Sequence, residues 1–244
     1  MNLKLFSGMK NYLLYILVLI FLILLSSCEK DSTIKENLFY EYYPVEVGHW
    51  IMYDVDAVVY DDFTGSVDTF YYQVKEVFES SFTDDAGNET IRLERFVRDD
   101  PDDNWQIKSV WTARRLPSRV EKVEENIRYI KLVFPPKVNK TWDGNAYNTK
   151  PEQTYKITQT HEPHAVNGLQ LDSVVTVVQA DFETLISKEY KVEKFALNIG
   201  MVYKEYVDLK KEIDGTVISG VDLKYSVVDY NDFLTHKSAL NTDY

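Results

Sequence analysis

The chain is poor in cysteine and in glycine, and these shortages exclude several kinds of site. Its 244 residues contain one cysteine, Cys28, so no disulfide can form within a single chain. Glycine occurs only 9 times, and the sequence contains no Gly-x-Ser-x-Gly elbow and no phosphate-binding glycine loop. The sequence therefore assigns no catalytic nucleophile, no cofactor-binding residue and no metal ligand.

Positive charge is also in short supply. Lysine and arginine together number 27 against 39 aspartates and glutamates, which gives a formal net charge of -12 at pH 7. A duplex nucleic acid partner is disfavoured, because contacts with phosphates need a basic patch. An acidic surface also argues against lying flat on anionic lipid, so a membrane attachment must come from another part of the chain.

Long apolar runs are scarce, and the clearest one, residues 12–25, carries no charge. Lys4 and Lys10 precede it, and the small residues Ser26 and Ser27 follow it. A basic lead, a short apolar core and small residues are typical of a secretory signal peptide. A permanent transmembrane helix needs about 20 apolar residues to cross roughly 30 Å of hydrocarbon, and this run is shorter. Residues 1–27 are therefore predicted to be a cleaved signal peptide.

The end of this segment, Leu25-Ser26-Ser27-Cys28, resembles the lipobox of bacterial lipoproteins: an aliphatic residue, two small residues and the invariant cysteine. The resemblance implies cleavage before Cys28, a diacylglyceryl group on its sulfur and a further acyl chain, such as palmitate, on the new amino group. Two or more acyl chains anchor a protein stably, whereas a single one holds it only marginally. Cys28 is thus the predicted lipidation site.

The residues after Cys28 bear on the destination of the protein. Lipoproteins retained in the inner membrane often carry Asp directly after the cysteine, whereas this chain carries Glu29 and then Lys30. By analogy, the outer membrane is the expected location, on either its periplasmic face or the cell surface. Residues 28–38 show no periodic pattern and are predicted to be a flexible tether.

Most of the remaining chain shows the alternation of apolar and polar residues that is typical of half-buried strands. In residues 50–60, for example, Ile51, Tyr53 and Val55 share one face, and Asp54 lies on the other. The 18 tyrosines and 12 phenylalanines also favour strands over helices. About eleven strands predict an antiparallel all-β fold: residues 50–60, 67–78, 90–97, 105–112, 119–124, 127–134, 154–160, 169–179, 186–195, 201–210 and 221–230.

No repeat and no Pro/Gly/Ser-rich linker divides this part of the chain, so residues 39–230 are predicted to be one domain and residues 231–244 a C-terminal tail. Short turns favour a single, strongly curved meander shaped as a half-barrel or barrel, with a β-sandwich as the alternative. The highly charged strand 119–124 is expected at a sheet edge. The run 174–178 is apolar on both faces and is expected at the centre. Trp142 is expected to pack its loop onto the core.

Two further stretches resemble a wider group of bacterial proteins. Residues 42–53, Tyr-Tyr-Pro-Val-Glu-Val-Gly-His-Trp-Ile-Met-Tyr, resemble the Tyr-x-Pro-Leu-x-x-Gly-x-x-Trp-x-Tyr opening of many uncharacterised envelope lipoproteins, with Val for Leu and one residue fewer before the Trp. Residues 195–204 resemble their later Ala-x-Gly-Ile-Gly-x-Val strand, with Asn198 in place of the first Gly. The resemblance implies an all-β lipoprotein domain and no known activity.

Two clusters contain residue types that bind metals. His161 and His164 offer imidazoles for zinc, but a catalytic site needs a third protein ligand, and Pro163 denies the pair a regular helix face. A solvated loop is the expected state of this segment. The acidic loop 99–104 does not follow the spacing of an EF-hand, and calcium binding stays open there; its carboxylates belong to Asp99, Asp100, Asp102 and Asp103.

Aromatic side chains are too numerous to be buried on one core face. Some are candidates for a platform that binds sugar or protein, because Tyr and Trp supply rigid amphipathic contact area. The alternative is that they pack the second face of the sheet. The residues concerned are Tyr40, Tyr42, Tyr43, Tyr71, Tyr72, Trp105 and Trp111.

Taken together, the sequence predicts a non-enzymatic, lipid-anchored envelope protein that binds or scaffolds, with an envelope protein or a glycan as the candidate partner. A first alternative is a carrier of an apolar ligand, which would need a hollow of several hundred Å³ lined by Ile, Val and Phe. A second alternative is an envelope hydrolase, which would need two carboxylates about 5 to 10 Å apart in a cleft.

Overall fold

The structure is a computed structural model that describes residues 37–231. The predicted signal peptide over residues 1–27, the lipidation site Cys28, and all but the ends of the predicted tether and tail lie outside these residues. Within the described range, no helix is both long and apolar enough to cross a membrane.

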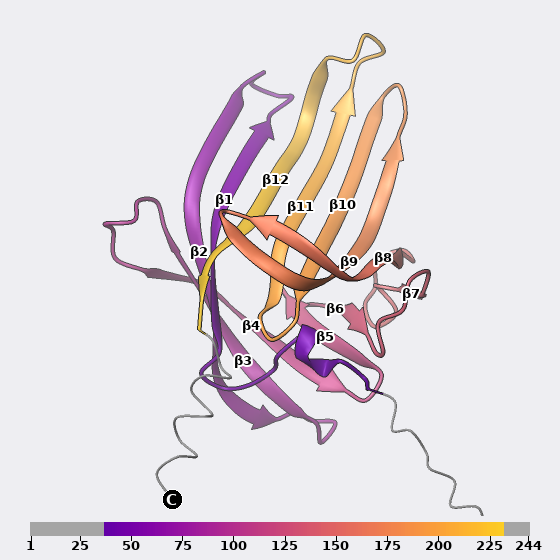
Figure 1. Cartoon of the computed structure of the whole chain (residues 1–244). Helices are drawn as coiled ribbons and strands as arrows, with labels where there is room; N and C mark the ends of the chain where they lie inside the picture. The colour runs from indigo at the N-terminus through magenta and orange to yellow at the C-terminus, as the bar shows by residue number, and fades with distance from the viewer. Residues whose placement is uncertain (1–36, 232–244) are drawn as a thin grey trace, which may run out of the picture. The chain divides into compact units, whose positions relative to one another are not determined.

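A single antiparallel sheet of twelve strands makes up almost all of the described chain, preceded by one turn of 3-10 helix, η1 (Tyr40–Tyr42) (Figure 1). One sheet rules out the sandwich and confirms the predicted curved meander. The strands are β1 (Trp50–Tyr60), β2 (Val67–Thr83), β3 (Glu89–Arg98), β4 (Gln106–Leu116), β5 (Arg119–Glu124), β6 (Ile127–Val133), β7 (Thr141–Asp143), β8 (Thr154–Val166), β9 (Leu169–Glu183), β10 (Ser187–Ala196), β11 (Gly200–Lys211) and β12 (Val217–Tyr230).

The strand order brings the first and last strands together. Strands consecutive in the chain are neighbours in the sheet except β6 and β7, which form its two free edges, and β1 also pairs with β12. The two edges nearly meet, because the amide of Ile130 donates a hydrogen bond of 3.0 Å to the carbonyl of Gly144. The indole Nε1 of Trp142 adds a second link of 2.9 Å to the carbonyl oxygen of Ile130. The sheet is therefore nearly closed into a barrel.

Bulges bend several of the strands. In β8, the pairing with β9 shifts register between Ile157 and Gln159 and twice more before His164, and such bulges increase local twist and bending. The end of the β8–β9 hairpin consequently turns across β10, β11 and β12 (Figure 1). Its turn residues Asn167 and Gly168 both have positive φ, as a tight two-residue hairpin requires. The side-chain amide of Asn167 donates a hydrogen bond of 3.2 Å to the carbonyl oxygen of Val227, and this bond holds the turn against β12.

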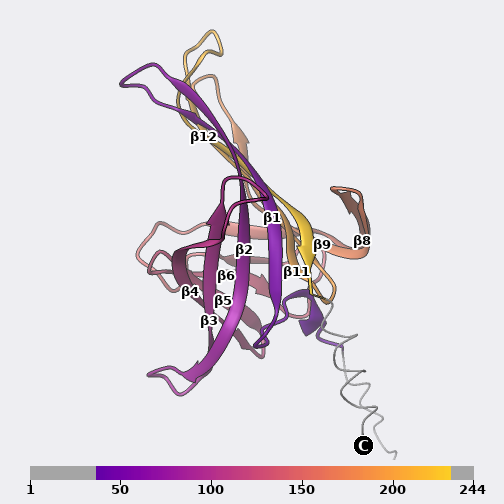
Figure 2. The same ribbon diagram turned by 90° about the vertical axis from the view of Figure 1, so that its left-hand side faces the viewer.

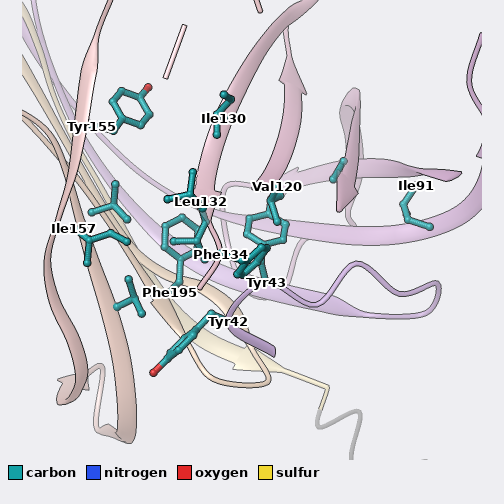
Figure 3. Packing of buried hydrophobic residues seen from close by; sticks show 14 of the residues in the cluster. Tyr42, Tyr43, Ile91, Val120, Ile130, Leu132, Phe134, Tyr155, Ile157 and Phe195 are labelled. Atoms are coloured by element: carbon teal, nitrogen blue, oxygen red, sulfur yellow. The ribbon is translucent and has the colours of Figure 1, made fainter. Parts of the chain in front are cut away.

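The main hydrophobic core fills the inside of the curved sheet near η1 (Figure 3). The 3-10 helix contributes Tyr42, and Tyr43 follows it; both are buried. Strands from both halves of the sheet, together with Phe134 directly after β6, contribute the rest, so this core holds the two halves together: Phe78, Ile91, Leu93, Ala113, Val120, Ile130, Leu132, Val133, Phe134, Tyr155, Ile157, Val175, Val177 and Phe195.

Strand β5 corrects the prediction that residues 119–124 form an edge. It lies between β4 and β6, with both neighbours hydrogen-bonded. Its charged side chains Glu121 and Lys122 are buried and paired with charges on other strands, so they need no water. By contrast, residues 174–177 of β9 are buried on both faces as predicted, although β9 is the third strand from the β7 edge and does not lie at the centre of the sheet.

The segment between β6 and β9 differs most from the prediction. Residues expected to be a solvated loop around Pro163 continue strand β8 as far as Val166. The short strand β7 was not predicted at all. It lies in the loop that Trp142 anchors, and Trp142 packs against the main core as expected. The register shifts in β8 explain the miss, because they remove the regular alternation that marks a strand.

Candidate functional site

A polar cavity of about 400 Å³ lies where β5 and β6 face β8–β11, beside the nearly closed seam of the sheet. Tyr155 belongs both to its wall and to the main core, so the core forms one side of the cavity; Figure 3 shows Tyr155 near Ile130 at the upper edge of that core. The lining residues are Glu124, Tyr129, Lys131, Asn145, Lys150, Pro151, Gln153, Tyr155, Gln179, Glu189, Lys191, Glu193, Lys204, Tyr206 and Asp208.

Strand periodicity places charges on the cavity side of β10 and β11. On β10, Glu189, Lys191 and Glu193 alternate with residues that point to the other face. The register sets each of them opposite a polar residue of β11, with Glu193 facing Lys204 and Glu189 facing Asp208. The Lys191 ammonium contacts Asp208 Oδ2 at 2.9 Å and Glu189 Oε2 at 3.2 Å. This wall is therefore a surface of opposite charges that neutralise one another.

The opposite wall contributes a buried lysine. The Lys131 ammonium on β6 donates a hydrogen bond of 2.5 Å to Glu193 Oε1, and it lies 3.5 Å from Glu124 Oε1. The Lys204 ammonium lies 3.9 Å from the same oxygen of Glu193. One lysine thus bridges carboxylates from β5 and β10, so the two halves of the sheet are joined by ion pairs as well as by the core.

These ion pairs continue into the interior as a line of alternating charges, which we call the charge chain: Arg95, Glu76, Lys122, Glu124, Lys131, Glu193 and Lys204. At its inner end, Glu76 contacts the Lys122 ammonium at 2.9 Å and the Arg95 guanidinium at 3.2 Å. The Trp111 ring packs against Arg95, with a distance of 3.9 Å from guanidinium carbon to ring centroid. The charge chain thus runs from the Trp111 ring to the cavity.

Electrostatics keeps Glu124 and Lys131 of the charge chain ionised. Burial raises the pKa of Glu124, but the neighbouring cations Lys131 and Lys122 outweigh it and hold that pKa well below its usual range. Burial lowers the pKa of Lys131, but Glu124 and Glu193 outweigh it and raise that pKa above its usual value. Both side chains are therefore charged at neutral pH.

Two side chains in the cavity wall retain a buried polar atom without a hydrogen-bond partner. These atoms are the amide nitrogen Nε2 of Gln179, a residue 8% exposed, and the carboxylate oxygen Oε2 of Glu193, a residue 1% exposed. A buried polar atom left unsatisfied costs about 1–3 kcal/mol. The wall thus contains one unused donor and one unused acceptor.

The two histidines considered as zinc ligands have separate protein partners. His161 Nδ1 shares a hydrogen bond of 2.7 Å with the Tyr42 hydroxyl, whereas His164 Nδ1 lies 3.4 Å from the Lys194 ammonium. Burial, assisted by Lys194, lowers the pKa of His164. Across residues 37–231, no three His, Cys, Asp or Glu side chains are grouped so that they could hold a metal ion.

The acidic loop uses its carboxylates locally. Asp100 Oδ1 accepts a hydrogen bond of 3.0 Å from the amide of Asp102, and Asp103 Oδ2 accepts one of 3.3 Å from the amide of Asp100. These contacts form a tight exposed turn between β3 and β4. Among the described residues, these four aspartates do not form a cluster that could hold a metal ion.

The aromatic residues considered as a platform are dispersed. Tyr42 and Tyr43 are in the main core, and Trp111 lies against Arg95. Trp105 packs under the Arg98 guanidinium, and among the seven only Tyr71 is exposed, at 70%. They therefore form no common exposed surface.

Sequence reasoning missed the cavity, although part of its signal is visible. The alternation Glu189-x-Lys191-x-Glu193 puts three charges on one face of a strand, which is unusual for a face that packs on a core. The partners of these charges on β6 and β11 could not be read from the sequence, because they depend on strand order and register.

Comparison with known proteins adds little. No protein-family model and no curated protein matches the chain. Among solved structures, the chain is similar to the crystal structure of a "putative lipoprotein" from Parabacteroides distasonis ATCC 8503, with 10% sequence identity and a TM-score of 0.36, over 81% of this chain and 100% of that one. A similarity this low supports no inference about this chain.

Proposed function

We propose that this protein is a lipid-anchored lipoprotein of the cell envelope, held by Cys28 in the outer membrane, whose β domain binds a small polar ligand without catalysing a reaction. The lipobox at residues 25–28 supports the anchor. The observation that carries the binding function is the polar cavity, with its unused donor and acceptor in the wall.

The lining of the cavity favours a polar ligand over an apolar one. An apolar carrier would need a hollow lined by Ile, Val and Phe, and the lining contains none of these residues. Charged and amide side chains predominate instead, and an apolar ligand could not replace the water that solvates them.

The carboxylates of the cavity favour binding over hydrolysis. Lys131 contacts both Glu124 and Glu193, so these two carboxylates lie close together, as the two catalytic carboxylates of a glycosidase do. A glycosidase, however, needs one carboxylic acid with a raised pKa that donates a proton to the leaving group. The pKa of Glu124 is lowered instead, and the Lys131 ammonium occupies the space between the two carboxylates.

The anchor is tested by replacing the lipidated residue. In Cys28→Ala, lipid cannot be attached, so the protein is expected either as a soluble secreted chain or as an unprocessed precursor. Ser27→Ala keeps a small residue before the cysteine and serves as the matched control, which should fractionate like the wild type. Membrane fractionation with an immunoblot for chain length reads the result. A Cys28→Ala chain of mature length in the outer membrane fraction would contradict the proposal.

A further inference from the structure

The structure points to the chemical class of the ligand: we propose that the cavity binds a neutral saccharide. This inference rests on the proposed function, because it assumes that the cavity is a ligand site. Three independent properties of the wall lead to it, namely its charge balance, its unused hydrogen-bonding atoms and its tyrosines.

The cavity is electrically balanced. Its lining contains four lysines and four carboxylates: Lys131, Lys150, Lys191, Lys204, Glu124, Glu189, Glu193 and Asp208. Three of the lysines contact all four carboxylates within the wall. The fourth, Lys150, is exposed, and its ammonium lies 5.4 Å from the centroid of the Tyr129 ring. A ligand with a net charge would enter a site whose formal charges already sum to zero, and would bury its own charge without an added counterion. A neutral ligand avoids this penalty.

The unused atoms call for a ligand that both accepts and donates hydrogen bonds. Gln179 Nε2 needs an acceptor, and Glu193 Oε2 needs a donor. A hydroxyl group supplies both functions, and a sugar ring carries several hydroxyls at fixed angles. The side-chain amide of Gln153 donates a hydrogen bond of 2.6 Å to the backbone carbonyl oxygen of Gln179. The backbone that carries the Gln179 side chain is therefore held in place before any ligand arrives.

The rest of the lining also suits a sugar. Tyr129, Tyr155 and Tyr206 present flat rings that end in hydroxyls, and such rings combine an apolar face with a polar edge. A sugar ring has the complementary character, with C–H groups on its faces and hydroxyls around its edge. A cavity of about 400 Å³ falls within the usual size range of small-ligand sites.

The test measures binding of defined probes to the full chain, purified in a detergent without a sugar headgroup. The probes are neutral mono- and disaccharides of glucose, galactose, mannose and N-acetylglucosamine, together with inorganic phosphate and the zwitterion glycine betaine. Isothermal titration calorimetry gives the affinities. At least one neutral sugar should bind, and Gln179→Leu, which replaces the amide donor by an apolar side chain, should weaken that binding at least tenfold.

Two further variants keep the test decisive. Gln170→Leu makes the same substitution at an exposed position of β9 outside the cavity, and should leave sugar affinity unchanged. If Gln179→Leu fails to fold, Gln179→Asn withdraws the amide by one methylene and should weaken binding in the same direction. An equal affinity of the wild type and a folded Gln179 variant would overturn the inference.

The probe panel also separates two kinds of failure. Binding of phosphate or glycine betaine that is lost in Gln179→Leu, with no sugar bound, would overturn the saccharide while leaving the proposed ligand-binding function intact. Binding of none of the probes would overturn both the saccharide and the proposed ligand-binding function. The lipid anchor is unaffected by either outcome, because its test is fractionation.

Discussion

Glu121 is the most highly paired acid of the domain, and its replacement gives the sharpest test of the structure. Its side chain is 1% exposed on β5. It accepts hydrogen bonds of 2.9 Å from Arg114, 2.7 Å from Arg119 and 2.7 Å from Arg128, so three cations from β4, β5 and β6 converge on one carboxylate. Asp84 provides a second anionic partner for Arg114.

Glu121→Gln should destabilise the domain strongly although it barely changes volume. Removing one partner of a buried ion pair costs about 3–5 kcal/mol, because the remaining charge stays buried and unpaired. The three arginines reach solvent in part and Arg114 keeps Asp84, so the lower end, about 3 kcal/mol, is expected here. For a domain of this size this corresponds to a fall in Tm of roughly 6–12 °C.

Urea unfolding at pH 7, followed by tryptophan fluorescence, measures the change in the free energy of unfolding. Glu89→Gln is the matched control, since Glu89 is exposed on β3, and it should change that free energy by no more than about 0.5 kcal/mol. A loss below about 1 kcal/mol in Glu121→Gln would refute the argument that this carboxylate holds the three arginines together.

The pH dependence separates charge from shape at this position. Burial raises the pKa of Glu121, but the three arginines outweigh it and hold that pKa below its usual value. An unfolded glutamate titrates near about 4.3, so the ionised side chain stabilises the fold above that pH, and this stabilisation is lost as pH falls through the lower pKa of the folded state. The wild type should therefore lose stability below pH 4.3 more steeply than Glu121→Gln, and equal slopes would contradict an ionic role.

Two further substitutions test the backbone and the seam of the sheet. Gly220 on β12 has a φ of +127°, and a Cβ there would collide with the carbonyl oxygen of Asp208, so Gly220→Ala should cost at least about 2 kcal/mol in urea unfolding. Gly65→Ala, at a positive φ in open space, should cost less, and equal losses would contradict the collision. Trp142→Phe removes the indole donor that reaches Ile130 and should cost about 1 kcal/mol; hydrogen exchange at the Ile130 amide should accelerate, and unchanged protection would argue against this link between β6 and β7.

Local patterns in the sequence were sufficient for most of the sheet. Strand β1 begins and ends where alternation predicts it, because it keeps a regular period of two between clear turns. Strand β8 could not be predicted over its full length, since its three register shifts break that period. The three residues of β7 have too few positions to show a period, and only pairing with β8 makes them a strand.

Burial of charge was the feature that the sequence could not reveal. A strand such as β5, with Glu121 and Lys122 adjacent, has the composition of an exposed edge. Whether such charges meet water or meet each other depends on residues far along the chain, since Lys122 pairs with Glu76 from β2. The same limit applies to the candidate site, where Lys131 of β6 meets Glu193 of β10 only after the sheet has curled.

The charge chain is hard to explain as a means of stabilising the fold. Well-packed apolar residues of similar volume generally stabilise an interior at least as well as buried ion pairs, because the desolvation of two charges offsets most of their attraction. An interior that serves only as a core therefore has no need of Lys131 and Glu193. A polar cavity does need them, because side chains fixed by mutual charge keep their hydrogen-bonding atoms in place without a ligand. The position of the charge chain, with one end among core aromatic residues and the other in the cavity wall, favours this explanation.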